Sequence, residues 1–270
     1  MTIMFSDVRG FTTISESYKH DPQGLTTLMN RFLTPLTNAI LARKGTIDKY
    51  MGDAIMAFWN APLDDPQQEV NACEAALEML ARADKLNQEF KREANQNGGK
   101  YMPLRIGIGL NTGPCVVGNM GSDFRFNYSV LGDTVNVASR LEARTKDYRI
   151  PIVIGEATAQ KAKERFATME IDRIQVKGKT QPETVFTVLG RTELGRDPSF
   201  LELHELTTKM LRYYREQNWT QALDTIEPCR KAAEGFGVGA LYHMYAERIE
   251  AFRHNPPPAD WNGVYEAESK

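Results

Sequence analysis

The order of apolar and polar positions predicts alternating strands and helices from the start of the chain to about residue 190. An apolar run over residues 3–5 is typical of a buried strand, and residues 24–43 place apolar side chains at the spacing of an amphipathic helix. The same patterns predict the other elements: strands within 46–60 (a hairpin about residues 51–53) and at 104–110, 115–118, 124–131, 151–154, 174–177 and 184–189, and helices at 67–93, from residue 133 and at 158–165. Strands and helices that alternate in this way, with hairpins between them, predict an α+β class.

The pattern changes after Gly190, where strand signals stop and helical periodicity continues. Three helices are predicted, at 200–217, 219–233 and 238–253. The expected divisions of the chain are a main domain at 1–190, a linker at 191–199, a helical extension resembling a repeat hairpin at 200–253, and a proline-rich tail at 254–270. One helix-hairpin unit cannot bury its own apolar face, so we expect the extension to pack on the main domain or on a partner.

Composition and charge limit the partners and the cellular compartment to be expected for the protein. The 270-residue chain is 41% hydrophobic, has a formal net charge of -2 and contains three cysteines. This charge gives no reason to expect a nucleic-acid partner, and no apolar run reaches the roughly 20 residues of a membrane-spanning helix. The widely spaced cysteines favour a reducing, cytoplasmic setting. A core strand that begins at residue 2 favours a chain cut from a longer protein, whose upstream part could hold sensory or membrane segments.

Two aspartates stand at predicted strand ends. Asp7 follows the first apolar run and precedes a turn at Gly10, and Asp53 lies at the tip of the 46–60 hairpin. Taken singly, aspartates at such positions are usually helix caps or turn residues. Together, two carboxylates on one small sheet can hold two divalent cations about 3.5–4 Å apart, the arrangement that serves in-line phosphoryl displacement. Carboxylate oxygens suit a hard cation such as Mg²⁺.

Several basic and amide side chains could accompany this pair. Asn136 and Arg140 lie one turn apart on the helix predicted from residue 133, so their side chains project together. Arg105 stands at the start of a strand, and Lys177 precedes a glycine at a turn. Each of these residues, taken alone, is as well explained by a solvated surface, because contact with phosphate requires only positive charge and donors.

Lys49 lies four residues before Asp53 in the same hairpin. On a regular strand its side chain would share a face with neither Asp48 nor Tyr50, since consecutive side chains alternate. Alone, it is as typical of a solvated edge lysine as of a binding residue.

Taken in order, these residues belong to five blocks that resemble the catalytic domain of a class III nucleotidyl cyclase, the family that makes cyclic AMP or cyclic GMP. The blocks are FSDVRGFT at 5–12, DKYMGDA at 48–54, RIGIG at 105–109, LGDTVNVASR at 131–140 and VKGK at 176–179. The similar region spans about residues 3–189 in the family's order, which makes the resemblance specific. It implies an α+β, ferredoxin-like cyclase core with added helices and hairpins, ahead of the helical extension.

The resemblance also implies roles for individual residues. Asp7 and Asp53, with the backbone carbonyl of Val8, match the metal ligands and would hold two divalent cations, Mg²⁺ or Mn²⁺. The other implied roles are purine reading by Lys49 and Ser129, phosphate binding by Arg105 and Lys177, and ribose orientation with transition-state stabilisation by Asn136 and Arg140. Sites of this family form between two catalytic domains, which implies a homodimer. One protomer would supply Asp7, Asp53 and Arg105, and the other would supply the remaining five side chains.

The purine pair favours ATP as substrate. Adenine N1 is an acceptor that suits the Lys49 ammonium, and the Ser129 hydroxyl can donate or accept. Guanine readers of the family usually place Glu and Cys at these positions, whereas Lys with Ser resembles a bacterial adenylyl subgroup. The implied enzyme is an adenylate cyclase, a phosphorus-oxygen lyase that makes 3′,5′-cyclic AMP and pyrophosphate by attack of the ribose 3′-hydroxyl on the α-phosphorus.

The sequence leaves the proton acceptor, the purine and a non-catalytic role as alternatives. The proton of the attacking hydroxyl could pass to Asp7, a water or the substrate itself. Within the family, a guanylate cyclase is the alternative to an adenylate cyclase. Outside enzymes, the alternative is a non-catalytic nucleotide-binding regulator with residues 200–253 as its interaction module, which the complete set of site residues disfavours.

Overall fold

The computed structural model of the protein describes residues 1–98, 101–175 and 182–265. The chain forms two compact units, Met1–Ala143 and Arg144–Lys270. No helix within the described ranges is both long enough and apolar enough to cross a membrane. Strands and helices alternate and a helical segment follows them, so the predicted α+β class is confirmed.

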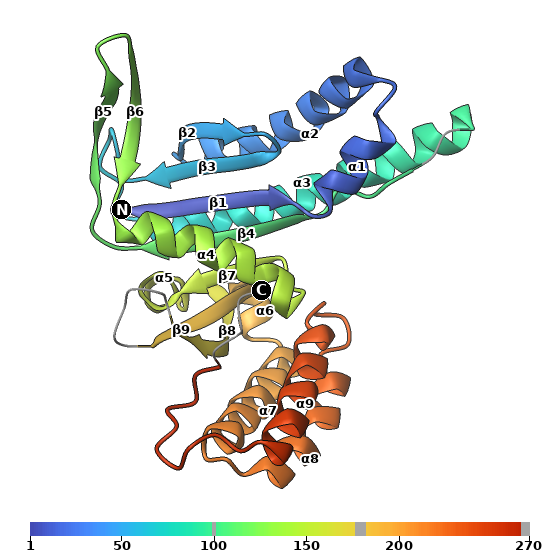
Figure 1. The fold of residues 1–270 in the computed structure, drawn as a ribbon, viewed down its shortest axis with the longest axis vertical. Helices are drawn as coiled ribbons and strands as arrows, with labels where there is room; N and C mark the ends of the chain where they lie inside the picture. Colours follow the sequence, from blue (N-terminus) through green and yellow to red (C-terminus); the bar gives the residue numbers. More distant parts are fainter. Residues whose placement is uncertain (99–100, 176–181, 266–270) are drawn as a thin grey trace. The chain divides into compact units, whose positions relative to one another are not determined.

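The first unit is built on the strands β2-β3-β1-β4, with a separate β5–β6 hairpin (Figure 1). Its elements, in chain order, are β1 (Thr2–Val8), α1 (Phe11–Ser17), α2 (Pro22–Ala42), β2 (Thr46–Met51), β3 (Ala54–Trp59), α3 (Gln68–Asn97), β4 (Ile106–Thr112), β5 (Val116–Ser122), β6 (Arg125–Leu131) and the start of α4 (Asp133–Tyr148).

Strand β1 is central and antiparallel to both of its neighbours. Ile3 and Met4 are fully buried on its opposite faces, which explains why the apolar run is continuous rather than alternating. Ile3 joins a core cluster with Phe58, Val130 and Ala138 of α4, and α3 packs against β1, β3 and β4. The strand that carries Asp7 is therefore held from both sides.

Helix α1 is a difference from the sequence expectation of a polar turn after Gly10. Gly10 adopts the left-handed conformation, with φ 68°, and then precedes the seven-residue helix Phe11–Ser17. Only Ile14 of this helix is buried, so its sequence carries too weak an apolar stripe to predict.

The second unit contains the strands β7-β9-β8 and the C-terminal helices. Its elements are β7 (Ile152–Gly155), α5 (Glu156–Ala162), β8 (Phe166–Ile174), β9 (Glu183–Arg191), α6 (Thr192–Gly195), α7 (Pro198–Arg215), α8 (Trp219–Ala232) and α9 (Gly239–His254). Strand β8 begins eight residues before the predicted one, because two irregularities in its pairing with β9 break the alternation on which the prediction depends.

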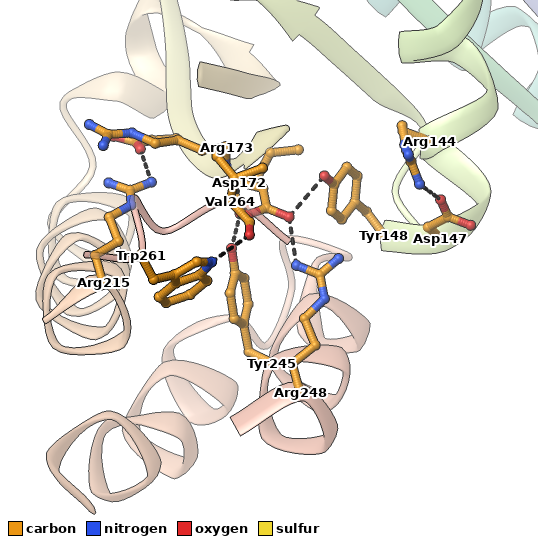
Figure 2. A network of polar contacts seen from close by, with 12 residues as sticks. Arg144, Asp147, Tyr148, Asp172, Arg173, Arg215, Tyr245, Arg248, Trp261 and Val264 are labelled. Atoms are coloured by element: carbon orange, nitrogen blue, oxygen red, sulfur yellow. Dashed lines mark hydrogen bonds and ion pairs between the residues drawn. The ribbon is translucent and has the colours of Figure 1, made fainter. Parts of the chain in front are cut away.

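The C-terminal helices pack on β8, as expected of an extension that cannot bury its own face. Figure 2 shows the contact: Tyr245 of α9 donates to the carbonyl of Ile171 at 2.7 Å, and Arg248 lies 2.6 Å from the Asp172 carboxylate. Tyr148 donates to the same carboxylate at 3.0 Å, and Arg215 pairs with Glu170. The helical segment is thus joined to the β8 strand by buried polar contacts as well as by apolar packing.

Candidate active site

The two predicted metal-binding aspartates lie together at one end of the first unit's sheet. Asp7 is near the end of β1, and Asp53 lies in the tight turn between β2 and β3, where Gly52 has φ 67°. Pairing of β1 with β3 brings the turn beside Asp7, and the Val8 amide donates to Asp53 Oδ2 at 3.2 Å. A positive φ at residue 52 favours glycine, so the MGDA segment is suited to this turn.

The environment of this pair raises the pKa of Asp53 from 3.8 to about 6. Burial is the largest cause, and a hydrogen bond with Asp7 and the negative charge of Asp7 add to it. Two carboxylates that disfavour joint ionisation are a fitting donor set for hard cations, which would relieve the repulsion. Within the described ranges no third His, Cys, Asp or Glu joins such a cluster, so a cation here would take its other ligands from the Val8 carbonyl, water and phosphate.

Arg105, a predicted phosphate ligand, lies beside the same strand end. It immediately precedes β4, its carbonyl accepts from the Arg9 amide at 2.7 Å, and Val8 faces Ile106 in the ladder. Its side chain is exposed, so the guanidinium is accessible to an anion. The structure therefore brings together Asp7, Val8, Asp53 and Arg105.

The two predicted purine readers also lie together, through Asp48, a residue for which the sequence predicts no role of its own. The Asp48 carboxylate accepts from Ser129 Oγ at 2.7 Å through Oδ2, and its Oδ1 lies 3.1 Å from Lys49 Nζ. The expectation that Lys49 shares no face with Asp48 is wrong. The β2–β3 ladder shifts register between Ile47 and Lys49, and such an irregularity ends the alternation of a regular strand.

Asn136 and Arg140 lie one turn apart on α4, as predicted. Val137, Ala138 and Leu141 of this helix are buried, whereas Asn136 is exposed and Arg140 half-buried. Lys177, the second predicted phosphate ligand, lies outside the described residues.

Helix α4 approaches β4 so closely that only glycine fits at position 109. A Cβ on Gly109 would lie 2.2 Å from the Glu142 amide nitrogen and 2.4 Å from the Ala138 carbonyl oxygen. Arg9 also binds Glu142 of α4, in an ion pair of 3.1 Å. Gly109 of the RIGIG block thus permits the close approach of the helix that carries Asn136 and Arg140.

Comparison with known proteins places this geometry in a family. Residues 1–189 match the family described as the adenylate and guanylate cyclase catalytic domain. The chain is 32% identical to adenylate cyclase 1 of Rhizobium meliloti (strain 1021) over 70% of its length, and 37% identical to the adenylate cyclase of Anabaena cylindrica, also over 70%. These matches cover 27% and 36% of the two relatives, so the chain spans about a third or less of their length.

Solved structures show the same likeness. The crystal structure of the adenylyl cyclase CyaB from P. aeruginosa superposes with a TM-score of 0.62 at 34% identity, over 69% of this chain and 92% of that one. Guanylyl cyclases are also among the similar proteins and structures. Both adenylyl and guanylyl cyclases are therefore similar to this chain in sequence and in fold.

Proposed function

Because this chain belongs to the family of class III adenylate and guanylate cyclase catalytic domains, we propose that it converts ATP to 3′,5′-cyclic AMP and pyrophosphate at sites shared between two copies of the chain. The observation that carries the choice of ATP is the common contact of Lys49 and Ser129 with Asp48. A donor and a hydroxyl held at one place match the N1 acceptor and the amino group of adenine.

Each group has a place in the proposed reaction. The ribose 3′-oxygen forms a bond to the α-phosphorus and gives up its proton to Asp7, a water or the substrate itself. Pyrophosphate leaves with the electron pair of the broken P–O bond. Asn136 orients the ribose, and Arg140 and Arg105 meet the charge on the phosphates. Two Mg²⁺ or Mn²⁺ ions held by Asp7, Asp53 and the Val8 carbonyl would supply Lewis acidity toward the hydroxyl and the triphosphate.

The proposal of a dimer is supported by an exposed apolar hairpin. Phe124 is 99% exposed at the tip of β5–β6, and Val116, Phe126 and Leu131 are at least 60% exposed along it. Several large apolar side chains exposed on one hairpin are typical of an interaction site. A second copy is the proposed occupant, because one of the similar solved structures is that of a dimeric guanylyl cyclase domain, 26% identical with a TM-score of 0.56.

The direct test is to incubate the purified chain with ATP or GTP and Mg²⁺ or Mn²⁺ and to separate the products chromatographically. We expect cyclic AMP and pyrophosphate from ATP, and much slower cyclisation of GTP. Preferential formation of cyclic GMP would support the second candidate, a guanylate cyclase, which the guanylyl relatives favour. No cyclic product from either nucleotide would overturn the proposal.

A further inference from the structure

We propose that Asp48 is a positioning residue for purine selection, which fixes the Ser129 hydroxyl as a hydrogen-bond acceptor and holds the Lys49 ammonium beside it. The inference rests on the proposed function, because it explains how the proposed purine pair would prefer ATP. Asp48 itself is not expected to touch the nucleotide, since its side chain is only 1% exposed.

The backbone explains how Asp48 reaches both residues. The register of the β2–β3 ladder shifts between Ile47 and Lys49, which leaves Asp48 as the additional residue of the bulged strand. Asp48 therefore points inward, where β2 contacts β6, while the Lys49 side chain, 46% exposed, remains accessible. Bulges beside active sites commonly redirect side chains in this way.

The hydrogen bonds of Asp48 determine whether the Ser129 hydroxyl can donate to a ligand or only accept from it. Both the Ser129 hydroxyl, at 2.7 Å, and the Val130 amide, at 3.3 Å, lie on Asp48 Oδ2. An ionised carboxylate only accepts, so the single hydroxyl proton of Ser129 is used toward Asp48. The hydroxyl then presents only lone pairs to a ligand, and Ser129 becomes an acceptor.

The other carboxylate oxygen restrains Lys49. Asp48 Oδ1 lies 3.1 Å from Nζ, in an ion pair that is not a hydrogen bond. A long lysine side chain loses considerable rotamer freedom on binding, and a buried opposite charge reduces that cost by holding the ammonium near its working position. The three Nζ protons remain available for a ligand.

Together, these two orientations distinguish the purines. Adenine has a 6-amino donor, which matches an acceptor at Ser129, and an N1 acceptor, which matches the Lys49 donor. Guanine has a 6-oxo acceptor and an N1–H donor, so both contacts would be mismatched. Sites built to hydrogen-bond discriminate strongly, because the wrong ligand leaves polar groups unpaired.

Nucleotide analogues separate this positioning role from a structural one. Purine riboside triphosphate lacks the 6-amino group, and 1-deaza-ATP lacks the N1 acceptor. In the wild-type chain we expect kcat/KM to favour ATP by roughly 3- to 10-fold over each analogue, the worth of one hydrogen bond. Ser129→Ala should remove the preference over purine riboside triphosphate, and Lys49→Ala the preference over 1-deaza-ATP.

Two variants of Asp48 test the assignment. Asp48→Ala should lower the preference for ATP over purine riboside triphosphate to nearly the value of Ser129→Ala. The double variant Asp48→Ala with Ser129→Ala should lower this preference no further. Asp48→Asn keeps an oxygen acceptor for Ser129 and Val130, so it should retain the preference for ATP over purine riboside triphosphate. It removes the charge that pairs with Lys49, so it should lose the preference for ATP over 1-deaza-ATP. Asp48→Asn also keeps the test available if Asp48→Ala does not fold.

The matched control is Asp65→Asn, which neutralises another buried aspartate of the first unit, one that binds Gln67 and Asn71 instead. It should leave both preferences unchanged. A merely structural role for Asp48 would lower kcat/KM for all nucleotides equally, and unchanged ratios in the Asp48 variants would overturn the inference while leaving the proposed function intact. Failure of the wild-type chain to cyclise any nucleotide would instead overturn the proposed function.

Discussion

Asp53→Asn tests the electrostatics of the acidic pair in the metal-free protein. The folded protein raises the pKa of Asp53 from 3.8 to about 6, so an ionised Asp53 costs the folded state free energy. Each pKa unit corresponds to about 1.36 kcal/mol, which would give about 3 kcal/mol for a fully buried group. Asp53 is half-buried, and solvent screening reduces the cost to roughly 1 kcal/mol.

The sign and the pH range follow from the direction of the shift. Because an acid with a raised pKa keeps its proton in the folded state, the cost is absent below about pH 4, grows between about pH 4 and 6, and is complete above about pH 7. In EDTA at pH 8, Asp53→Asn should therefore raise the melting temperature by about 2–4 °C, and at pH 4 it should not. The asparagine can still accept from the Val8 amide.

Thermal unfolding by circular dichroism, with and without Mn²⁺, measures both halves of this prediction. Divalent cations should stabilise the wild-type chain by roughly 2–3 kcal/mol at a hundredfold excess over their dissociation constant, and should have little effect on the variant. Asp64→Asn, which changes an exposed aspartate outside the helices and strands, is the control and should change neither value. A metal-free Asp53→Asn protein that melts below the wild type at pH 8 would refute the reasoning.

Three further predictions address the dimer, helix α4 and the second unit. Mixing Asp7→Ala protein with Arg140→Ala protein should restore about a quarter of wild-type cyclase activity. Half of the dimers would be mixed, and each mixed dimer would hold one intact site. No recovery of activity would contradict shared sites. Gly109→Ala should destabilise the protein by about 1–3 kcal/mol in urea unfolding and lower activity by displacing α4, whereas Gly239→Ala, with open space around it, should be tolerated. Arg248→Ala should lower the free energy of unfolding by about 3–5 kcal/mol, because Asp172 stays buried without its ion pair. The double variant Asp172→Asn with Arg248→Met leaves no unpaired charge and should lower it less.

Much of the fold was predictable because the core elements carry strong periodic signals. The continuous apolar run of β1, the stripes of α2 and α3 and the turn at Gly52 all led to elements close to those observed. The misses have a common cause, since α1 buries one side chain and β8 contains two irregularities. Neither kind of element presents the alternation or the stripe that a prediction from sequence requires.

The site shows the same limit at the level of single residues. Asp7, Asp53 and Arg105 could be selected because each stands at the end of a predicted element, and strand pairing then brings them together. Asp48 could not, because alternation directed its side chain away from Lys49, and only a one-residue shift in the ladder reverses that direction. Asp48 is the first residue of the DKYMGDA block, but the motif alone does not show that its buried carboxylate accepts the Ser129 hydroxyl proton. If Asp48 positions the purine pair as proposed, purine specificity depends on the register shift between Ile47 and Lys49. Relatives with the same Lys and Ser but a regular β2 strand should then discriminate the purines less well.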